Sequence, residues 1–434
     1  MYKPRFKVVF SNERIISPSG LGIVGGMLAK SDFVKRCNRI PIDKRRSEPQ
    51  IKNGDILLTY IGLLCQAKTP FEAVNEMKDD PEFYKDALGI VRGIPSVETL
   101  RQRMDDIGSS LRAQILQANV DMFRTHTVVP SALPTGEVPL DIDVTPFDNS
   151  KTNKEGVSRT YKGFDGYAPI MASIGNEGFL VNTELREGKQ HCQKGTPRFL
   201  EETLHLSHEL TDASLLIRMD SGNDAKENLG ILLEDGDWLI VKRNPRSKET
   251  KDEWLAKVKD CCKDIRNPRD GKVVYVGSSW KDVEYVTSDG EVKTICMRIV
   301  YEVIERTIDK YGQILLSPDI ELNTWWTNLG WTDDAVIASS IFASKAYFEN
   351  PVSRIQEIYK FRSKVVHGET VSEKLRIVKL QEDVTISSVE LARRILEYLL
   401  LAVADHAEFL DPNNIDSFFL SGYEERIKKD VGES

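Results

Sequence analysis

Two apolar stretches far apart in the chain each carry an aspartate where a strand is expected to end. LDIDVT occupies residues 140–145, and LLIRMD occupies residues 215–220. The apolar residues of the first stretch alternate with Asp141 and Asp143, so both acids share one face of the strand. The second stretch is almost continuously apolar, which is typical of a strand buried on both faces, and Asp220 closes it. The pattern predicts an α/β fold in which Asp143 and Asp220 meet at one sheet edge.

Carboxylates from separate strands are the ligands that a two-metal phosphodiester site requires. Such a site holds two ions about 3.5–4 Å apart and clamps the attacking and leaving oxygens. Mg²⁺ prefers carboxylate oxygens, retains several waters and takes one or two acids from any element. Asp143 and Asp220 are therefore predicted to be catalytic ligands of Mg²⁺ or Mn²⁺, and Asp141 is an alternative on the same strand.

The elements predicted around these acids follow the order of an RNase H-like core. Three strands form a meander, and a helix, a strand, a helix and a strand follow them. The fold class is thus an RNase H-like mixed sheet. The expected strands span residues 140–145, 167–174, 178–185, 214–219 and 237–241, and the expected helices span residues 196–210 and 225–233.

Changes of composition divide the rest of the 434-residue chain. A stretch with three prolines marks a linker, and an Asp289-Gly290 turn signal lies within a β-rich insertion. The predicted regions are a helical DNA-binding region at 1–127, the linker at 128–139, the catalytic core at 140–254, the β-rich insertion and return at 255–332, and a helical tail at 333–434.

The first fifty residues are strongly basic. They contain eleven Lys or Arg and four Asp or Glu, an excess of seven positive charges on a chain whose net charge is −8. A basic segment on an acidic chain suits contact with phosphates, and a solvated basic surface explains the same pattern equally well.

A helix is expected to begin at Ser96, which has the residue type of an N-cap. It lies in GIPSVETLRQRMDDI at residues 93–107, where apolar residues recur at helical spacing. One interpretation is a recognition helix in the major groove, with Ser96, Arg101 and Arg103 toward DNA. An ordinary amphipathic helix is the simpler interpretation.

Three further basic residues follow the last predicted core strand beside the acids. Lys242, Arg243 and Arg246 lie in KRNPR at residues 242–246. Contact with DNA phosphates and exposure to solvent explain them equally well.

Composition also bears on the compartment. No run of 18 apolar residues is present, so no membrane segment is expected, and no leader pattern is seen at the N-terminus. The six cysteines form no CxxC pair, which favours reduced thiols and a cytoplasmic protein.

Five segments, in order, resemble DDE transposases of bacterial insertion sequences, specifically the group-1 DDE domain subfamily. The resemblance extends to residue 337 and implies an RNase H-like catalytic domain, an N-terminal DNA-binding region and cut-and-paste chemistry with Mg²⁺. It also implies terminal inverted repeats and target DNA as partners, and a homodimer as the active species. The segments are LDIDVTPFDNSKTNKEGVSRTYKGFDGYAPI (140–170), ELREGKQHCQKGTP (184–197), RMDSGNDAKEN (218–228), IVKRNPR (240–246) and TWWTNLGWTDDAVI (324–337).

The resemblance matches Asp143 to the family's first acid and Asp220 to its second, with Asp224 as a possible helper. The third acid of the family is a glutamate on a helix just after the segment that ends at residue 337, and no counterpart is evident. Glu357 lies in roughly the right region. Without a third acid we expect DNA binding with weak or no cleavage, so a non-catalytic DNA-binding remnant is an alternative function.

The C-terminal tail carries a second resemblance. Residues 355–368 (IQEIYKFRSKVVHG) and the apolar stretch 389–404 are similar to the C-terminal part of a HEPN-like domain. Arg362 and His367 reproduce that group's Arg-x4-His pattern, which implies metal-free RNA cleavage by acid–base catalysis and charge stabilisation. An RNA nuclease or dimerisation module is thus a further alternative, although a tail without its own activity is favoured.

Two histidines stand one turn apart on the helix predicted at residues 196–210. His205 and His208, with Glu202 nearby, have the spacing of metal ligands. No partner ligands are visible in the sequence, so surface histidines are the favoured interpretation.

Overall fold

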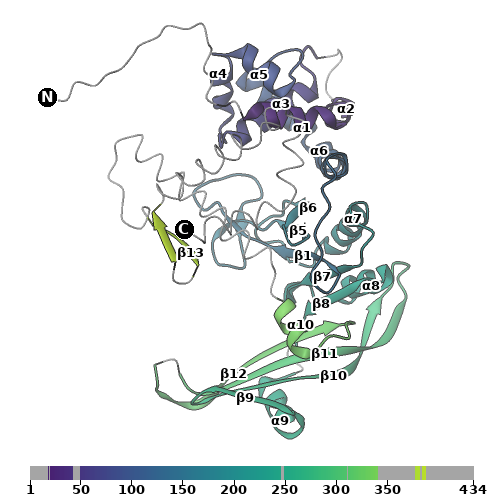
Figure 1. The fold of residues 1–434 in the computed structure, drawn as a ribbon, viewed down its shortest axis with the longest axis vertical. Coiled ribbons are helices and arrows are strands. Elements are labelled where there is room, and N and C mark those ends of the chain that lie inside the picture. Colours follow the sequence, from purple (N-terminus) through teal and green to yellow (C-terminus); the bar gives the residue numbers. More distant parts are fainter. Residues whose placement is uncertain are drawn as a thin grey trace, which may run out of the picture. The chain divides into compact units, whose positions relative to one another are not determined.

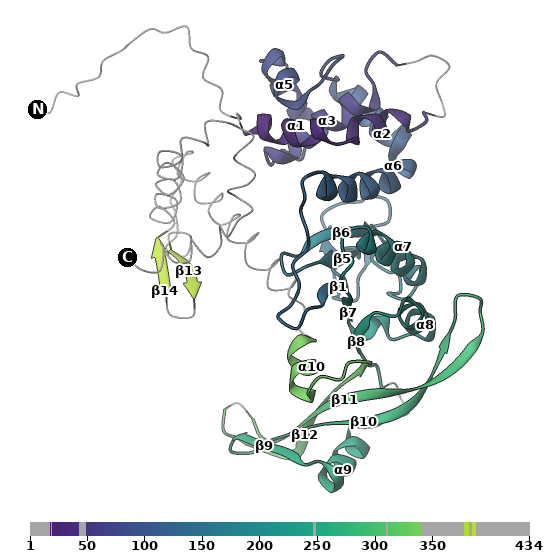
Figure 2. The ribbon, with the colours of Figure 1, turned by 45° about the vertical axis from the view of Figure 1, so that its right-hand side comes forward.

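The computed structural model describes most of the chain before residue 341. It covers residues 18, 20–42, 49–245, 249–309 and 311–340, together with the backbone of 377–381 and 384–387. The chain divides into two compact units, residues 1–344 and 345–434. Figures 1 and 2 show the elements of the first unit, which contains both predicted acids.

The described part of residues 1–127 is helical, as predicted. An apolar core of its own holds these helices together, and its fully buried residues include Ile56, Leu63 and Leu100. The helices are α1 (Leu21–Lys30), α2 (Phe33–Arg39), α3 (Asn53–Cys65), η1 (Phe71–Ala73), α4 (Val74–Met77), α5 (Pro81–Leu88) and α6 (Val97–Thr125).

Helix α6 begins where the sequence predicts and continues far beyond the expected segment. The Ser96 hydroxyl accepts a hydrogen bond from the Thr99 amide at 3.1 Å, which caps the helix. Ile107 is buried among the N-terminal helices, whereas Leu116 and Val120 are buried against the sheet that follows. Figures 1 and 2 both show α6 between these two parts. The helix therefore belongs to both hydrophobic cores.

A buried carboxylate fixes the connection between α5 and α6. Asp55 in α3 is 4% exposed and accepts hydrogen bonds from the Val91 and Arg92 amides at 3.0 and 2.8 Å. We expect Asp55→Ala to lower the free energy of unfolding by about 1–3 kcal/mol, because two hydrogen bonds to a buried carboxylate are lost. Denaturant unfolding followed by helical circular dichroism measures the change. The exposed Asp79→Ala is the matched control, and equal stability of the two variants would contradict the expectation.

A nine-stranded sheet forms the centre of the unit, with the order β6-β5-β1-β7-β8-β12-β11-β10-β9. Its first five strands confirm the predicted RNase H-like core, since β5 and β6 are antiparallel neighbours in a meander from β1, and β7 and β8 run parallel to β1. The core elements are β1 (Val138–Val144), β5 (Ile170–Ile174), β6 (Phe179–Glu184), α7 (Thr196–His208), β7 (Leu215–Met219), α8 (Lys226–Asp235) and β8 (Trp238–Lys242).

The two faces of this sheet differ in character. On one face the alternate residues of β1 and β7, such as Ile142 and Ile217, pack with residues of α6, α7 and α8. On the other face Leu216 packs with Val336 of α10 (Asp333–Ser339), whose N-cap is Thr332. The second face also carries Asp141, Asp143, Arg218 and Asp220, because residues two apart on a strand point the same way.

The predicted β insertion is a continuation of the core sheet. Strand β12 pairs antiparallel with β8, so the long strands lengthen the sheet instead of forming a separate one. The Asp289-Gly290 turn joins β10 to β11 as expected, with Gly290 at a positive φ of 86°. Helix α9 was not predicted, although a Thr250–Glu253 capping box marks its start. These elements are α9 (Lys251–Cys261), β9 (Asp264–Arg269), β10 (Lys272–Val286), β11 (Val292–Ile308) and β12 (Ile314–Thr327).

The prediction of a helical tail from residue 333 is wrong for one segment. In the second unit β13 (Ile377–Gln381) and β14 (Val384–Ser387) form an antiparallel pair. β-Branched residues are frequent in both segments, IVKLQ and VTIS, and such residues favour strands. None of the helices in the described part of the chain combines the length and apolar character needed to cross a membrane.

Candidate active site

Four connections meet at one edge of the sheet, because β1, β6, β7 and β8 all run in one direction and end there. The connections are residues 145–169, 185–195, 220–225 and 243–250. The first contains a small sheet of order β2-β4-β3, made of β2 (Phe147–Asp148), β3 (Ser158–Arg159) and β4 (Asp165–Tyr167). Side chains from distant parts of the sequence are therefore brought to this edge.

The structure places the two predicted acids in neighbouring positions. Ile142 of β1 is in register with Met219 of β7, so the next residues, Asp143 and Asp220, stand side by side where both strands end. Parallel neighbours lie about 4.8 Å apart in the sheet. The Asp143 side chain is half-buried and accepts a hydrogen bond from the Val144 amide at 2.8 Å. Two hard oxygen donors at this spacing fit a shared divalent ion.

The loop after β7 holds Asp220 in place. One carboxylate oxygen of Asp220 accepts hydrogen bonds from the Gly222 amide at 3.2 Å and from the Asn223 side-chain amide at 2.7 Å. Asn223 is completely buried, and its backbone carbonyl accepts from the Asn228 side chain. This buried turn restricts the rotation of the Asp220 carboxylate.

Tyr161, which sequence reasoning left out, and Cys192, which it took as structural or DNA-proximal, stand next to the acids. Tyr161 is exposed as a whole, but neighbouring protein atoms partly desolvate its hydroxyl group and raise its pKa, and the negative charges of Asp143 and then Asp220 raise it further. Burial also raises the pKa of Cys192, with Asp220 as the second cause, and its thiol donates to the Gly222 carbonyl at 2.9 Å. The Tyr161 hydroxyl donates to the Val144 carbonyl at 3.3 Å. Both residues lie within the segments that carry the family resemblance, which was the available signal.

Asp141 does not join this pair. Its carboxylate forms a two-point ion pair with Arg218, with distances of 2.5 Å to Nε and 2.8 Å to Nη2. Asp141 is 5% exposed and Arg218 is 3% exposed. The interpretation of Asp141 as an alternative metal ligand is therefore wrong, because a guanidinium already neutralises this carboxylate.

The last described turn of α10 lies beside the same strands. The Ser339 carbonyl accepts a hydrogen bond at 3.0 Å from Nη1 of Arg218, which stands two residues before Asp220 on β7. The chain thus returns to the acid-bearing face after the long β extension. Glu357, Arg362 and His367 lie outside the described residues.

Asp224 links the acid-bearing loop to two other strands. One of its carboxylate oxygens accepts from the Asn244 amide after β8 at 2.8 Å, and the other accepts from the Trp326 indole of β12 at 3.2 Å. Asp224 therefore serves as a structural tie in the described structure, in agreement with the turn role that its position after a strand suggests.

Two of the basic residues predicted to contact DNA are buried. Arg103 is 1% exposed and donates to Asn53 Oδ1 at 2.9 Å inside the N-terminal core. Arg243 is 6% exposed, pairs with Glu249 at 2.9 Å and stacks 4.5 Å from the Trp326 ring centroid. Both predictions are wrong, since neither guanidinium is accessible to a phosphate.

The other predicted DNA contacts have different environments. Ser96 is exposed and caps α6. Arg101 is exposed and pairs with Glu72 at 2.8 Å. Lys242 is half-buried at the end of β8, and Arg246 lies outside the described residues. Their contact with DNA stays a prediction.

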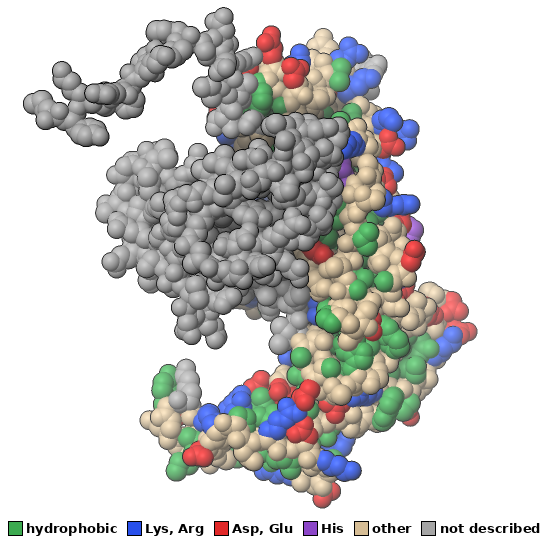
Figure 3. Space-filling model, viewed as in Figure 1, with side chains coloured by type: hydrophobic (Ala, Val, Ile, Leu, Met, Phe, Trp, Pro, Cys, Tyr) green, Lys and Arg blue, Asp and Glu red, His purple; other side chains and the backbone are tan. Residues whose placement is uncertain are grey.

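Two connections at this sheet edge carry six exposed basic side chains that were not singled out. They belong to the connections after β1 and β6, which share the sheet edge of Asp143 and Asp220. The same connections carry four exposed acids, Asp148, Glu155, Asp165 and Glu187. Basic and acidic side chains are likewise mixed over β9–β12 on the face drawn in Figure 3. The residues of this basic rim are Lys151, Lys154, Arg159, Lys162, Lys189 and Lys194.

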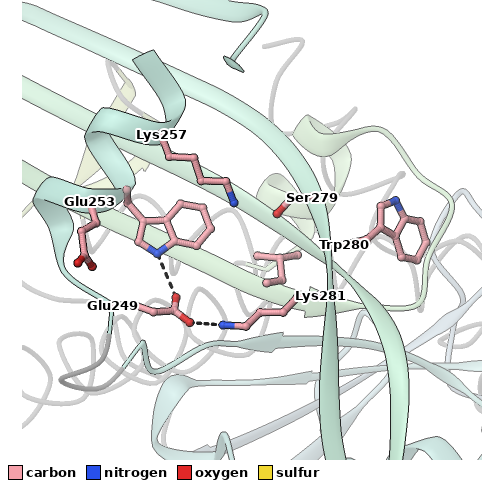
Figure 4. Close-up of a pocket in the computed structure, with 8 residues that line it drawn as sticks. Glu249, Glu253, Lys257, Ser279, Trp280 and Lys281 are labelled. Atoms are coloured by element: carbon pink, nitrogen blue, oxygen red, sulfur yellow. Dashed lines mark hydrogen bonds and ion pairs between the residues drawn. The ribbon is translucent and has the colours of Figure 1, made fainter. Parts of the chain in front are cut away.

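A separate pocket of about 280 Å³ lies in the β extension, between α9 and the strands β10 and β11. Figure 4 shows Glu249 pointing between Trp254 and Lys281, and its carboxylate contacts them at 3.0 and 2.5 Å. Burial acts to raise the pKa of Glu249, but hydrogen bonds from Arg243, Lys281 and Trp254 outweigh it and lower the pKa to about 2. The lining contains neither predicted acid.

The lowered pKa of Glu249 predicts a pH-dependent contribution to stability. Because the pKa falls from 4.5 to about 2 on folding, the contribution is present above pH 4.5 and is lost as the pH falls toward 2. We expect Glu249→Gln to lower the free energy of unfolding at neutral pH by about 1–2 kcal/mol after solvent screening. Urea unfolding at several pH values measures this, and a loss that does not shrink with acidification would contradict it.

Of three comparisons with known proteins, one identifies a family. A family model described as transposase DDE domain group 1 matches residues 1–301. No curated protein matches the chain. Among solved structures, a cryo-EM structure of a piggyBac transposase synaptic complex with hairpin DNA is similar, with 14% sequence identity and a TM-score of 0.31. That similarity covers 73% of this chain and 61% of the piggyBac chain, so less than two thirds of the latter is spanned.

Proposed function

Because the chain belongs to the group 1 family of transposase DDE domains, we propose that it is the transposase of an insertion sequence. In this proposal it binds the terminal inverted repeats of its element as a homodimer, and it cuts and joins DNA strands with Mg²⁺ or Mn²⁺. The observation that carries the proposal is the adjacent placement of Asp143 and Asp220 at the ends of two parallel strands.

The donor set at this edge fits a hard divalent ion. Asp143 and Asp220 supply carboxylate oxygens from different strands, and the buried Asn223 orients one of them. When bound, divalent ions would lower the pKa of a water or a 3′-hydroxyl and stabilise the leaving oxygen. The protein's own part is to hold the two carboxylates on one face of the sheet, at the ends of β1 and β7, and to supply a third acid. Glu357 remains the candidate for that acid.

DNA is expected to lie along the basic rim. Its six exposed Lys and Arg side chains lie in connections that begin at the sheet edge of the acids, so we expect them to contact phosphates near the scissile bond. Tyr161 stands on the same side and is 70% exposed, which makes it available to a DNA strand next to the acids. This rim replaces Arg103 and Arg243 as the proposed phosphate contacts.

Nicking of the element's own ends tests the proposal. The full-length protein is incubated with DNA that carries the inverted repeats flanking its gene, in Mg²⁺, in Mn²⁺ or in EDTA. We expect strand cleavage at the repeat ends that requires the divalent ion. Specific binding of the ends without cleavage under any metal condition would instead identify a non-catalytic DNA-binding remnant.

The HEPN-like alternative rests on Arg362 and His367 and stays a prediction. It requires RNA cleavage in EDTA that disappears in His367→Ala. Because the transposase chemistry needs metal and this chemistry does not, the two activities are separable in one preparation.

A further inference from the structure

Three side chains with metal-ligand chemistry converge at the opposite edge of the core sheet from Asp143 and Asp220. His208 is the last residue of α7, Asp235 is the last residue of α8, and Asp237 directly precedes β8. Their ligand atoms all lie within 4.8 Å of one another. An Asp237 oxygen also accepts the Leu215 amide at the start of β7 at 3.0 Å, which fixes the cluster to the sheet.

The distances within the cluster are compatible with ligands of one ion, and His208 also forms a hydrogen bond with Asp235. His208 Nε2 lies 3.2 and 3.3 Å from the two Asp235 oxygens and 3.4 Å from Asp237 Oδ2. Charge-assisted hydrogen bonds between such groups are shorter, about 2.7–2.9 Å. Ligands held about 2.0–2.2 Å from a tetrahedral Zn²⁺ stand roughly 3.3–3.5 Å apart, which is close to the separations of His208 Nε2 from the aspartate oxygens.

A buried oxygen supplies a second, independent indication. Asp237 is 9% exposed, and its Oδ2 atom is inaccessible to solvent and has no hydrogen-bond partner in the described structure. A buried carboxylate oxygen without a donor is costly, and it faces the cluster, where His208 Nε2 is its neighbour. A cation at that point would satisfy it.

The local charge also calls for a cation. Two carboxylates and the negative ends of the α7 and α8 dipoles meet here, and a protonated His208 would supply only one positive charge. Among the described residues, no Lys or Arg forms an ion pair with Asp235 or Asp237. The surroundings therefore favour an ion with two positive charges.

We propose that His208, Asp235 and Asp237 bind a divalent transition-metal ion of the Zn²⁺ class, which ties the ends of α7 and α8 to the start of β8. The imidazole nitrogen distinguishes this site from one for Mg²⁺, which prefers oxygen ligands alone. Three protein ligands leave the fourth tetrahedral position to water. The site is distinct from the Asp143–Asp220 pair and does not depend on the proposed function.

Zinc binding by the full-length protein tests this site directly. The double variant Asp143→Asn, Asp220→Asn serves as the background, so that the acid pair does not contribute. We expect one Zn²⁺ per chain by calorimetry after EDTA treatment and dialysis, with binding weakened about a hundredfold or more by His208→Gln. The matched control is His205→Gln on the same helix, whose side chain is 75% exposed and contacts Glu209 instead, and it should bind as tightly as the background.

Two further readouts separate this site from the cysteines and from a folding defect. Bound Co²⁺ should show nitrogen and oxygen coordination without thiolate charge-transfer bands. Zn²⁺ should raise the thermal unfolding midpoint of the His205→Gln variant and leave that of His208→Gln unchanged. Equal Zn²⁺ affinity in the two histidine variants, or thiolate bands with Co²⁺, would overturn the proposal. His208 is on the surface, so its replacement leaves folding intact even if Asp237→Asn does not.

Discussion

Asp220→Asn is expected to reduce metal-dependent cleavage of the element's ends by about a thousandfold. The substitution removes a negative ligand beside Asp143 at the ends of two parallel strands. Metal ions supply several kcal/mol of charge stabilisation to such a transition state, and each 1.4 kcal/mol corresponds to a tenfold change in rate. An asparagine oxygen can still accept the hydrogen bonds from Gly222 and Asn223, so the loop should keep its conformation.

Initial rates of nicking on end-labelled repeat DNA measure this effect. Asp212→Asn is the matched control, because Asp212 is an exposed aspartate just before the first residue of β7, whereas Asp220 follows its last residue. The control should cleave at the wild-type rate, and both variants should bind the repeats. Cleavage by Asp220→Asn at the rate of the control would remove this carboxylate from the catalytic site.

Arg218→Ala is expected to have the largest effect on stability. The substitution leaves Asp141, which is 5% exposed, as a buried charge without its guanidinium, and it also removes the bond to the Ser339 carbonyl. Breaking one side of a buried ion pair costs about 3–5 kcal/mol. Urea unfolding followed by tryptophan fluorescence suits this measurement, because all six tryptophans lie between residues 238 and 331.

A double variant separates the lost charge partner from lost packing. Asp141→Leu combined with Arg218→Met removes both charges, so it should recover most of the stability lost in Arg218→Ala. Arg198→Ala, at an exposed position on α7, should change little. A single Arg218→Ala variant as stable as the wild type would show that the ion pair contributes nothing to folding.

The core of the fold was predictable because its signals are local. Alternation in residues 140–144 and a continuous apolar run in 215–219 identify β1 and β7, and each run ends at an aspartate. Two antiparallel turns of the meander and the single crossover helix α7 leave β7 parallel to β1, which brings Asp143 and Asp220 to one edge. The order of elements thus predicts that both acids lie at the same edge, and the pairing of β7 with β1 makes them adjacent.

The burial of charged residues was not predictable in the same way. Arg103 looks like any surface arginine on a helix until Asn53, fifty residues earlier, is placed against it. Likewise, Arg243 looks like a free cation after a strand until Trp326, more than eighty residues later, lies across it. Such partners depend on tertiary contacts that a local pattern does not contain.

The pairing of strands in the β extension shows the same limit. A sequence pattern marks β12 as a strand but does not specify its neighbour, and its pairing with β8 decides whether the extension is a separate domain or part of the sheet. The short strands β2, β3 and β4 were also missed, because two or three residues carry too little periodicity.

The shared helix α6 limits how this protein could be rebuilt from parts. Its first half is buried with the N-terminal helices, and Leu116 and Val120 in its second half complete the core beneath the sheet. A gene cut at the proline-rich stretch would leave these two side chains exposed on one fragment and a hole in the other. Recombination at that point is thus expected to yield insoluble halves. An exchange of N-terminal DNA-binding regions between related proteins would have to transfer α6 together with the sheet on which it packs.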